Sequence, residues 1–246
     1  MTTKTIVAWD GSREAWAALD WAVARESHRD GTIVLVTVVD DLFLRTTLAE
    51  ESNAIVESAV EQLQAQVARL AVEAPRVHVG TEILRGTPLL VLREYTHPST
   101  LVVLGADDTE GSEGILRSLG GRLLGSAHGP LALIPLTTAA KGRGIVLGTN
   151  MATHASKADE FAAGEAELTG EVLITYPADS AEFLIGALTA DLVVVAGPAH
   201  GILTSLLARA ASNVTLTMPC PVVAFGPHAT ANPGEPPPRA EALFSS

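Results

Sequence analysis

The sequence has 246 residues, of which 47% are hydrophobic and 18% charged, enough for one large domain or two small ones with a sizeable core. Its net charge of -12 disfavours direct binding to DNA or RNA, whose phosphates such a surface repels. No apolar run reaches the roughly 18 residues of a membrane span, and Asp10 interrupts the first one early, so we expect a cytoplasmic protein without a membrane partner.

Short apolar runs alternate with helical patterns over the first 136 residues. Residues 48–74 give the clearest helix, because apolar side chains recur there at spacings of three and four. In the first helical pattern, Trp16, Leu19 and Val23 mark one face, which we expect to lie in the core. The alternation predicts βαβ units and an open, parallel, Rossmann-like α/β sheet. We expect its strands at residues 5–9, 32–39, 76–84, 100–105 and 130–136.

The pattern starts again after a linker at residues 137–144, so the chain contains an internal repeat. "GIVLGTN" in the second copy matches "TIVAWDG" in the first, and both copies end with a strand that follows a proline. The second copy is shorter and has room for one strand–helix unit fewer. We therefore expect two tandem domains, at 1–139 and 140–226, and a disordered, proline-rich tail at 227–246.

The loop "GADDTEGSEG" (105–114) follows the fourth expected strand and precedes a helical pattern. Backbone amides at such a junction suit an anion, and ligands of open α/β sheets bind at the carboxyl ends of the strands. The "DGS" turn (10–12) lies at another such end, so we expect both segments to line one crevice. Acidic side chains in the loop oppose phosphate binding, namely Asp107, Asp108, Glu110 and Glu113.

In combination, the first strand with "DGS", the "GTP" turn (86–88), the "LVVLG" strand and the ending "PCPVV" (219–223) resemble the universal stress protein family in its tandem two-domain form. The family fold is an open parallel α/β sheet whose members pair through their last strands. The resemblance therefore implies that "LALIPL" (131–136) lies beside "PVVAFG" (221–226) as an intrachain pseudo-dimer. Such pairing would cover two edge strands that otherwise expose backbone groups. Further association into a homodimer stays open.

Some members of that family bind ATP, and the resemblance implies which residues would hold it here. Asp10 matches the aspartate after the first strand, Val38 the second-strand residue near the adenine, and Gly105 the first glycine of the phosphate loop. Asp108 stands where the second loop glycine belongs, and Ser118 falls near the Gly-Ser pair that ends the pattern. Mg²⁺ that bridged Asp108 to the phosphates would offset its charge. The implied ligand is ATP with Mg²⁺, and the implied nucleotide-binding residues are Asp10, Val38, Gly105, Asp108 and Ser118.

No motif indicates a catalytic centre or a metal site. The P-loop, the dinucleotide fingerprint and Gly-x-Ser-x-Gly are absent, and neither the histidines nor Cys220 show metal-ligand spacing. The favoured interpretation is a non-catalytic, stress-response binding or regulatory protein, with weak ATP binding in the N-terminal domain and an unidentified protein partner. Two alternatives stay open: a slow ATP-hydrolysing or phosphotransfer enzyme, and a ligand-free protein-interaction scaffold.

Overall fold

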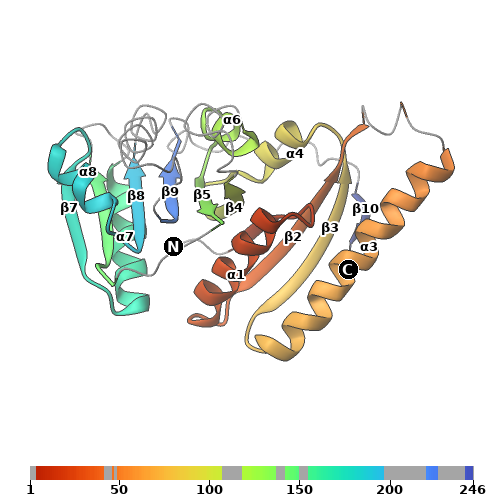
Figure 1. The fold of residues 1–246 in the computed structure, drawn as a ribbon, viewed down its shortest axis with the longest axis horizontal. Coiled ribbons are helices and arrows are strands. Elements are labelled where there is room, and N and C mark those ends of the chain that lie inside the picture. Colours follow the sequence, from red (N-terminus) through yellow and green to blue (C-terminus); the bar gives the residue numbers. More distant parts are fainter. Residues whose placement is uncertain are drawn as a thin grey trace.

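The computed structural model describes residues 4–41, 46, 49–106, 118–136, 142–149, 155–196, 220–226 and 242–245. Within them, one sheet of ten strands runs through the molecule in the order β10-β3-β2-β1-β4-β5-β9-β8-β6-β7. Helices lie on both of its faces (Figure 1). The fold class predicted from the sequence, an α/β protein built on an open and mostly parallel sheet, is confirmed.

The first half of the sheet contains five parallel strands. The elements in chain order are β1 (Lys4–Ala8), α1 (Arg13–Ser27), β2 (Thr32–Val39), α3 (Ala49–Glu73), β3 (His78–Arg85), α4 (Pro88–Tyr95), β4 (Thr100–Ala106), α6 (Leu119–Leu124) and β5 (Pro130–Pro135). β1 pairs with both β2 and β4, so the strand order reverses beside it. That reversal creates the crevice at which ligands of open α/β sheets bind.

The second half repeats this arrangement with four strands, of which β9 follows a segment outside the described residues. Its elements are β6 (Ile145–Thr149), α7 (Ala155–Thr169), β7 (Leu173–Pro177), α8 (Ala181–Ala187), β8 (Leu192–Ala196) and β9 (Val222–Phe225). One strand–helix unit lies between β6 and β8, where the first half has two between β1 and β4. Between these strands the second half therefore has one strand–helix unit fewer than the first half, as the shorter repeat predicts.

The two halves share the sheet through β5 and β9. These strands are antiparallel, with Leu131 opposite Ala224 and Leu133 opposite Val222. "LALIPL" and "PVVAFG" therefore lie side by side, and all four of these residues are buried.

The end of the chain differs from the sequence prediction. Residues 242–245, inside the tail predicted to be disordered, form β10 (Ala242–Ser245), which runs antiparallel to β3. β3 would otherwise end the sheet with unpaired backbone groups, and a short apolar strand can satisfy them. The other residues of the predicted tail lie outside the described residues.

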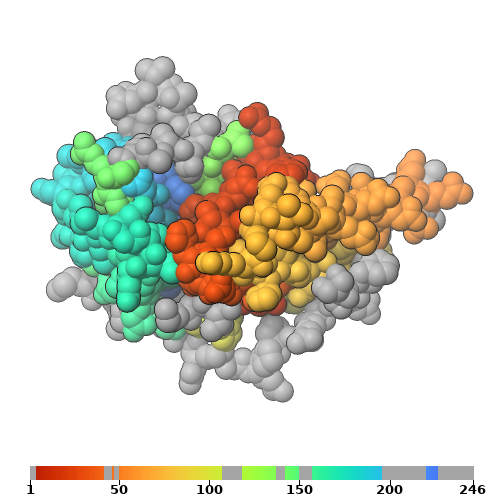
Figure 2. Space-filling view, turned by 90° about the horizontal axis from the view of Figure 1, so that it is seen from below, coloured from red at the N-terminus to blue at the C-terminus, as the bar shows by residue number. Residues whose placement is uncertain are grey.

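The core has two layers, one on each face of the sheet. Strand residues alternate between them: Val7 belongs to the layer that contains α1, α3 and α7, whereas Ile6 belongs to the layer with α4, α6 and α8. Figure 2 shows α1 between α3 and α7 on the first of these faces. Leu19 of α1 is fully buried as predicted, but Trp16 is 37% exposed. It stacks edge-on against Trp9, with the ring centroids 5.2 Å apart, and so covers the rim of the core.

Candidate functional site

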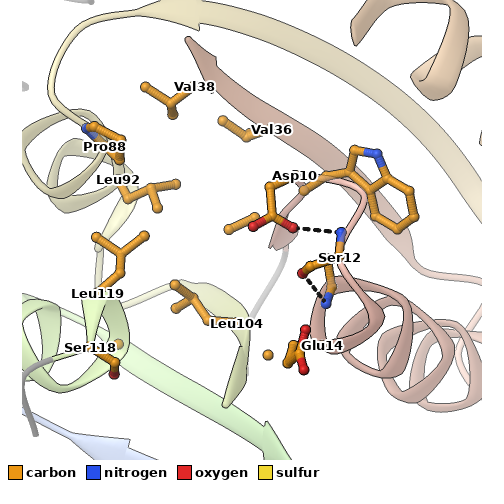
Figure 3. Close-up of a pocket in the computed structure, with 15 residues that line it drawn as sticks. Asp10, Ser12, Glu14, Val36, Val38, Pro88, Leu92, Leu104, Ser118 and Leu119 are labelled. Carbon is orange, nitrogen blue, oxygen red and sulfur yellow. Dashed lines mark hydrogen bonds between the residues drawn. The ribbon is translucent and has the colours of Figure 1, made fainter. Parts of the chain in front are cut away.

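A cavity of about 580 Å³ lies at the carboxyl ends of β1, β2 and β4. Asp10, Val38, Gly105 and Ser118, which the sequence places in one site, all line it. Figure 3 shows Asp10 and Ser118 on separate walls, with apolar side chains between them. Asp108, the fifth predicted residue, belongs to the segment 107–117, which lies outside the described residues.

Asp10 is held at the mouth of the cavity by the turn that follows β1. Its carboxylate accepts a hydrogen bond from the backbone amide of Ser12 at 2.9 Å, and Gly11 takes a positive φ of 78° between them. Ser12 is the N-cap of α1, because its hydroxyl accepts a hydrogen bond from the amide of Ala15 at 3.1 Å. The "DGS" turn thus brings the first turn of α1 to the cavity, and Figure 3 shows both bonds.

Gly105 lies where β4 passes beneath the start of α1. A side chain there would begin 2.3 Å from the carbonyl carbon and oxygen of Glu14, closer than any real contact. The glycine is therefore required for α1 to pack onto β4, a reason that the loop motif alone does not reveal.

Ser118 forms the far wall at the start of α6. Its hydroxyl accepts a hydrogen bond from the amide of Gly121 at 3.3 Å, so Ser118 is the N-cap of that helix. The match to the end of the family's phosphate pattern and the cap of α6 thus fall on the same residue.

One side of the cavity is apolar. Val36 and Val38 come from β2, Leu104 from β4 and Leu119 from α6, while Pro88 and Leu92 come from α4 (Figure 3). The contribution of α4 was missed by sequence reasoning, although the signal was present. The "GTP" turn starts α4 with Thr87 as N-cap and Pro88 at its first position, at the carboxyl end of β3.

The polar side of the cavity is acidic. Asp10 and Glu14 line it, and no lysine or arginine does so among the described residues. Glu14 was not predicted as a site residue. Two carboxylates would therefore repel an anionic ligand here, unless a bound cation offsets the charge of the ligand.

A second cavity of about 470 Å³ adjoins the first on the α3 side. Trp9, Asp10 and Val38 border both cavities, and Ser58 and Gln62 of α3 line the second. Asp10 therefore lies between two adjoining cavities at the carboxyl ends of β1 and β2.

The described residues show no metal centre and no membrane span. No group of three or more histidine, cysteine, aspartate or glutamate side chains is arranged there to hold a metal ion. In the same part of the chain, no helix combines the length and the apolar character needed to cross a bilayer.

The doubly covered sheet, its reversal at β1 and the cavity at that point define an open, doubly wound α/β fold with a cavity where the strand order reverses. The family model described as "Universal stress protein family" matches residues 1–135. The chain belongs to the universal stress protein family, a family of stress-response proteins.

Curated relatives match one half of the chain. Universal stress proteins from two strains of Mycobacterium tuberculosis are each 30% identical over 129 residues, which is 52% of this chain. The chain spans about half the length of these relatives, since the match covers 47% of each.

Solved structures match the fold over both halves. A universal stress protein from Archaeoglobus fulgidus superimposes with a TM-score of 0.65 at 16% identity, over 91% of this chain and 96% of that one. A putative universal stress protein from Pseudomonas aeruginosa gives a TM-score of 0.53 at 11% identity, over 92% and 94% of the two chains. At these identities the likeness concerns the fold alone.

Proposed function

We propose that this protein is a non-catalytic stress-response regulator that binds an adenine nucleotide weakly in the cavity beside Asp10. One observation carries the proposal: residues from four separate segments that match the family's nucleotide pattern line one cavity. The volume of about 580 Å³ falls within the range of small-molecule pockets.

The walls of the cavity suit the different parts of a nucleotide. The apolar side, with Val38 and Leu92, offers a surface for a nucleobase. The Asp10 carboxylate can accept hydrogen bonds from ribose hydroxyls. In this proposal the phosphates extend toward the first turn of α1 and the wall at Ser118, because a helix start favours negative charge.

The two carboxylates are the reason to expect weak binding and a role for Mg²⁺. Two unit charges about 5 Å apart repel by roughly 0.8 kcal/mol in water and roughly 3 kcal/mol at an effective dielectric of 20. Asp10 and Glu14 each act on the ligand in this way. Mg²⁺ bound to the phosphates would neutralise part of their charge, so we propose the magnesium complex of ATP as the ligand.

Calorimetric titration with ATP tests the proposal. Saturable binding that strengthens with Mg²⁺ and disappears in Asp10→Ala would support it. Asp179→Ala, an exposed aspartate in the turn after β7, is the matched control and should bind as the wild type does. Absence of binding at millimolar ATP would refute the proposal and favour a ligand-free scaffold, whereas Mg²⁺-dependent release of phosphate would show an enzyme.

The second half of the chain serves, in this proposal, as an internal partner for the first. The antiparallel pairing of β5 and β9 supports an intrachain pseudo-dimer, because it closes an edge that a single copy would leave open.

A further inference from the structure

β7 lies at one end of the sheet, and among the described strands it pairs only with β6 (Figure 1). Its five residues, Leu173–Pro177, carry no charge. The opposite end of the sheet is covered, since β10 pairs antiparallel with β3. The chain thus closes one end of its sheet with a short strand of its own and leaves the other end open within the described residues.

The internal repeat explains why β7 is unsuited to an edge. β7 stands beside β6 as β2 stands beside β1. β2 is an interior strand, because β3 pairs with it along its whole length from Thr32 to Val39. The described part of the second half has no counterpart of β3. β7 therefore has the uncharged composition of an interior strand and, apart from Pro177 at its end, carries none of the residues that usually protect an edge.

Apolar side chains extend this open edge. Val172, directly before β7, is 67% exposed, and Ile185 of α8 is 62% exposed. Tyr176 of β7 packs against Gly186 of the same helix, which brings α8 beside the strand. An incoming strand would find apolar surface next to unpaired backbone groups.

Exposed acids lie in the segments next to the edge strand: Glu167, Glu171, Asp179 and Glu182. They face fewer cations among the described residues, namely Lys157 at the start of α7 and the exposed Arg143, which precedes β6 by two residues as Glu171 precedes β7. Burial, and next the nearby charge of Asp191, raise the pKa of Glu171. A second copy of this chain would bring the same acids to the edge. Charge complementarity therefore favours a basic partner.

We propose that the β7 edge is the docking site for an extended segment of a partner protein, with an uncharged, β-forming centre and basic residues at both ends. The segment adds to the sheet as a further strand. Its backbone hydrogen bonds to β7 supply affinity, and the exposed acids near β7 select for its basic ends. This site lies in the second half of the chain and does not depend on nucleotide binding beside Asp10.

Two labelled peptides test the proposal by fluorescence anisotropy with the full chain. Peptide KRVTVTVRK should bind saturably, and its counterpart EEVTVTVEE at least about tenfold more weakly, as several screened charge pairs predict. Amide exchange in residues 173–176 should slow when the basic peptide is present, because those amides gain partners or cover.

A variant pair locates the binding. Thr175→Lys places a cation on the exposed face of β7 and should weaken binding of the basic peptide at least about fivefold. Val72→Lys, at a position on α3 that is 80% exposed, is the matched control and should leave binding unchanged. Circular dichroism and Tm of both variants confirm that they are folded.

Several results would overturn the proposal. Equal binding of both peptides, or unchanged binding in Thr175→Lys, would show that the β7 edge does not select a basic strand. A dimer in sedimentation experiments that Thr175→Lys converts to a monomer would show that a second copy occupies the edge instead.

Discussion

Arg25 of α1 and Glu165 of α7 form a buried ion pair that connects the two halves of the chain. The Arg25 Nε donates to both carboxylate oxygens at 3.0 Å, and one terminal nitrogen donates to Oε1 at 2.5 Å. Their side chains are 4% and 5% exposed. The Arg25 guanidinium also lies 5.3 Å from the ring centroid of Phe161. Such bidentate geometry fixes how α1 and α7 sit relative to each other.

Removing one partner of this pair should be costly. Glu165→Leu removes the carboxylate that both the buried Arg25 and Arg29 contact, and leaves Arg25 near Glu26 and the Thr5 hydroxyl. We expect a loss of about 3–5 kcal/mol in the free energy of unfolding. The double variant Arg25→Met with Glu165→Leu should regain part of that loss, because it removes both charges of the pair while Arg29 stays 3.8 Å from the buried Glu26. Urea unfolding measures both.

An exposed ion pair provides the control. Arg69 and Asp20 join α3 to α1 at 3.4 Å, with the Asp20 side chain 63% exposed. Asp20→Asn should change stability by at most about 1 kcal/mol. Equal losses of unfolding free energy in Glu165→Leu and Asp20→Asn would contradict the conclusion that the buried ion pair stabilises the contact between the two halves.

Gly105→Ala should destabilise the protein, because its methyl group would overlap the backbone of Glu14. We expect a cost of about 1–3 kcal/mol, typical of overpacking, and a change in the cavity wall. Gly164→Ala is the matched control: it lies within α7, and a side chain there meets nothing within 4 Å. It should be neutral or stabilising by up to about 1 kcal/mol, since alanine favours a helix. Thermal unfolding compares the two variants.

Asp191 organises the segment that leads into β6. Its two carboxylate oxygens accept hydrogen bonds from the amides of Gly142 and Gly144, both at 2.9 Å. Asp191→Ala leaves these amides without their acceptor, so we expect a loss of about 1–3 kcal/mol on chemical unfolding. Asp191→Asn keeps an oxygen acceptor and should lose less. Equal losses would show that the charge of Asp191, and not its hydrogen bonds, stabilises this segment.

The raised pKa of Glu171 gives a dependence of stability on pH with a defined sign. Burial first, and Asp191 second, disfavour its charged form in the folded protein. The folded state therefore binds the proton more tightly than the unfolded state. The contribution of Glu171 to stability is complete below the ordinary carboxyl pKa and is lost as pH rises through the raised value.

Side-chain NMR titration measures this effect directly. In Asp191→Asn the pKa of Glu171 should fall toward its ordinary value, because the nearby charge is gone, and the decline of stability across that pH window should shrink. An unchanged Glu171 titration would mean that Asp191 does not act on it.

The local patterns predicted most of the fold. The run Thr32–Val39, rich in β-branched residues, predicted a buried strand. The internal repeat predicted that the second half has one strand–helix unit fewer. β10 was missed because four residues acquire strand structure from pairing with β3 rather than from their own pattern. The Arg25–Glu165 pair was missed for a related reason, since 140 residues separate the partners and no periodic signal connects them.

The sequence predicted that certain strand-end residues lie close together. The residues that follow strand ends, Asp10 and Gly105, do line one cavity, because parallel strands end at a common edge. Sequence reasoning did not identify the acidic Glu14 or the α4 wall at Leu92, since each depends on how a helix packs over the sheet. Nor could it show that Gly105 serves the packing of α1.

The most direct test of the nucleotide proposal is amide chemical-shift mapping of the full chain during titration with ATP and Mg²⁺. The account predicts saturable shifts concentrated at the residues that line the cavity, from the turn at Asp10 to the start of α6 at Ser118, and their loss in Asp10→Ala. Shifts that do not saturate, or that concentrate away from this cavity, would contradict it.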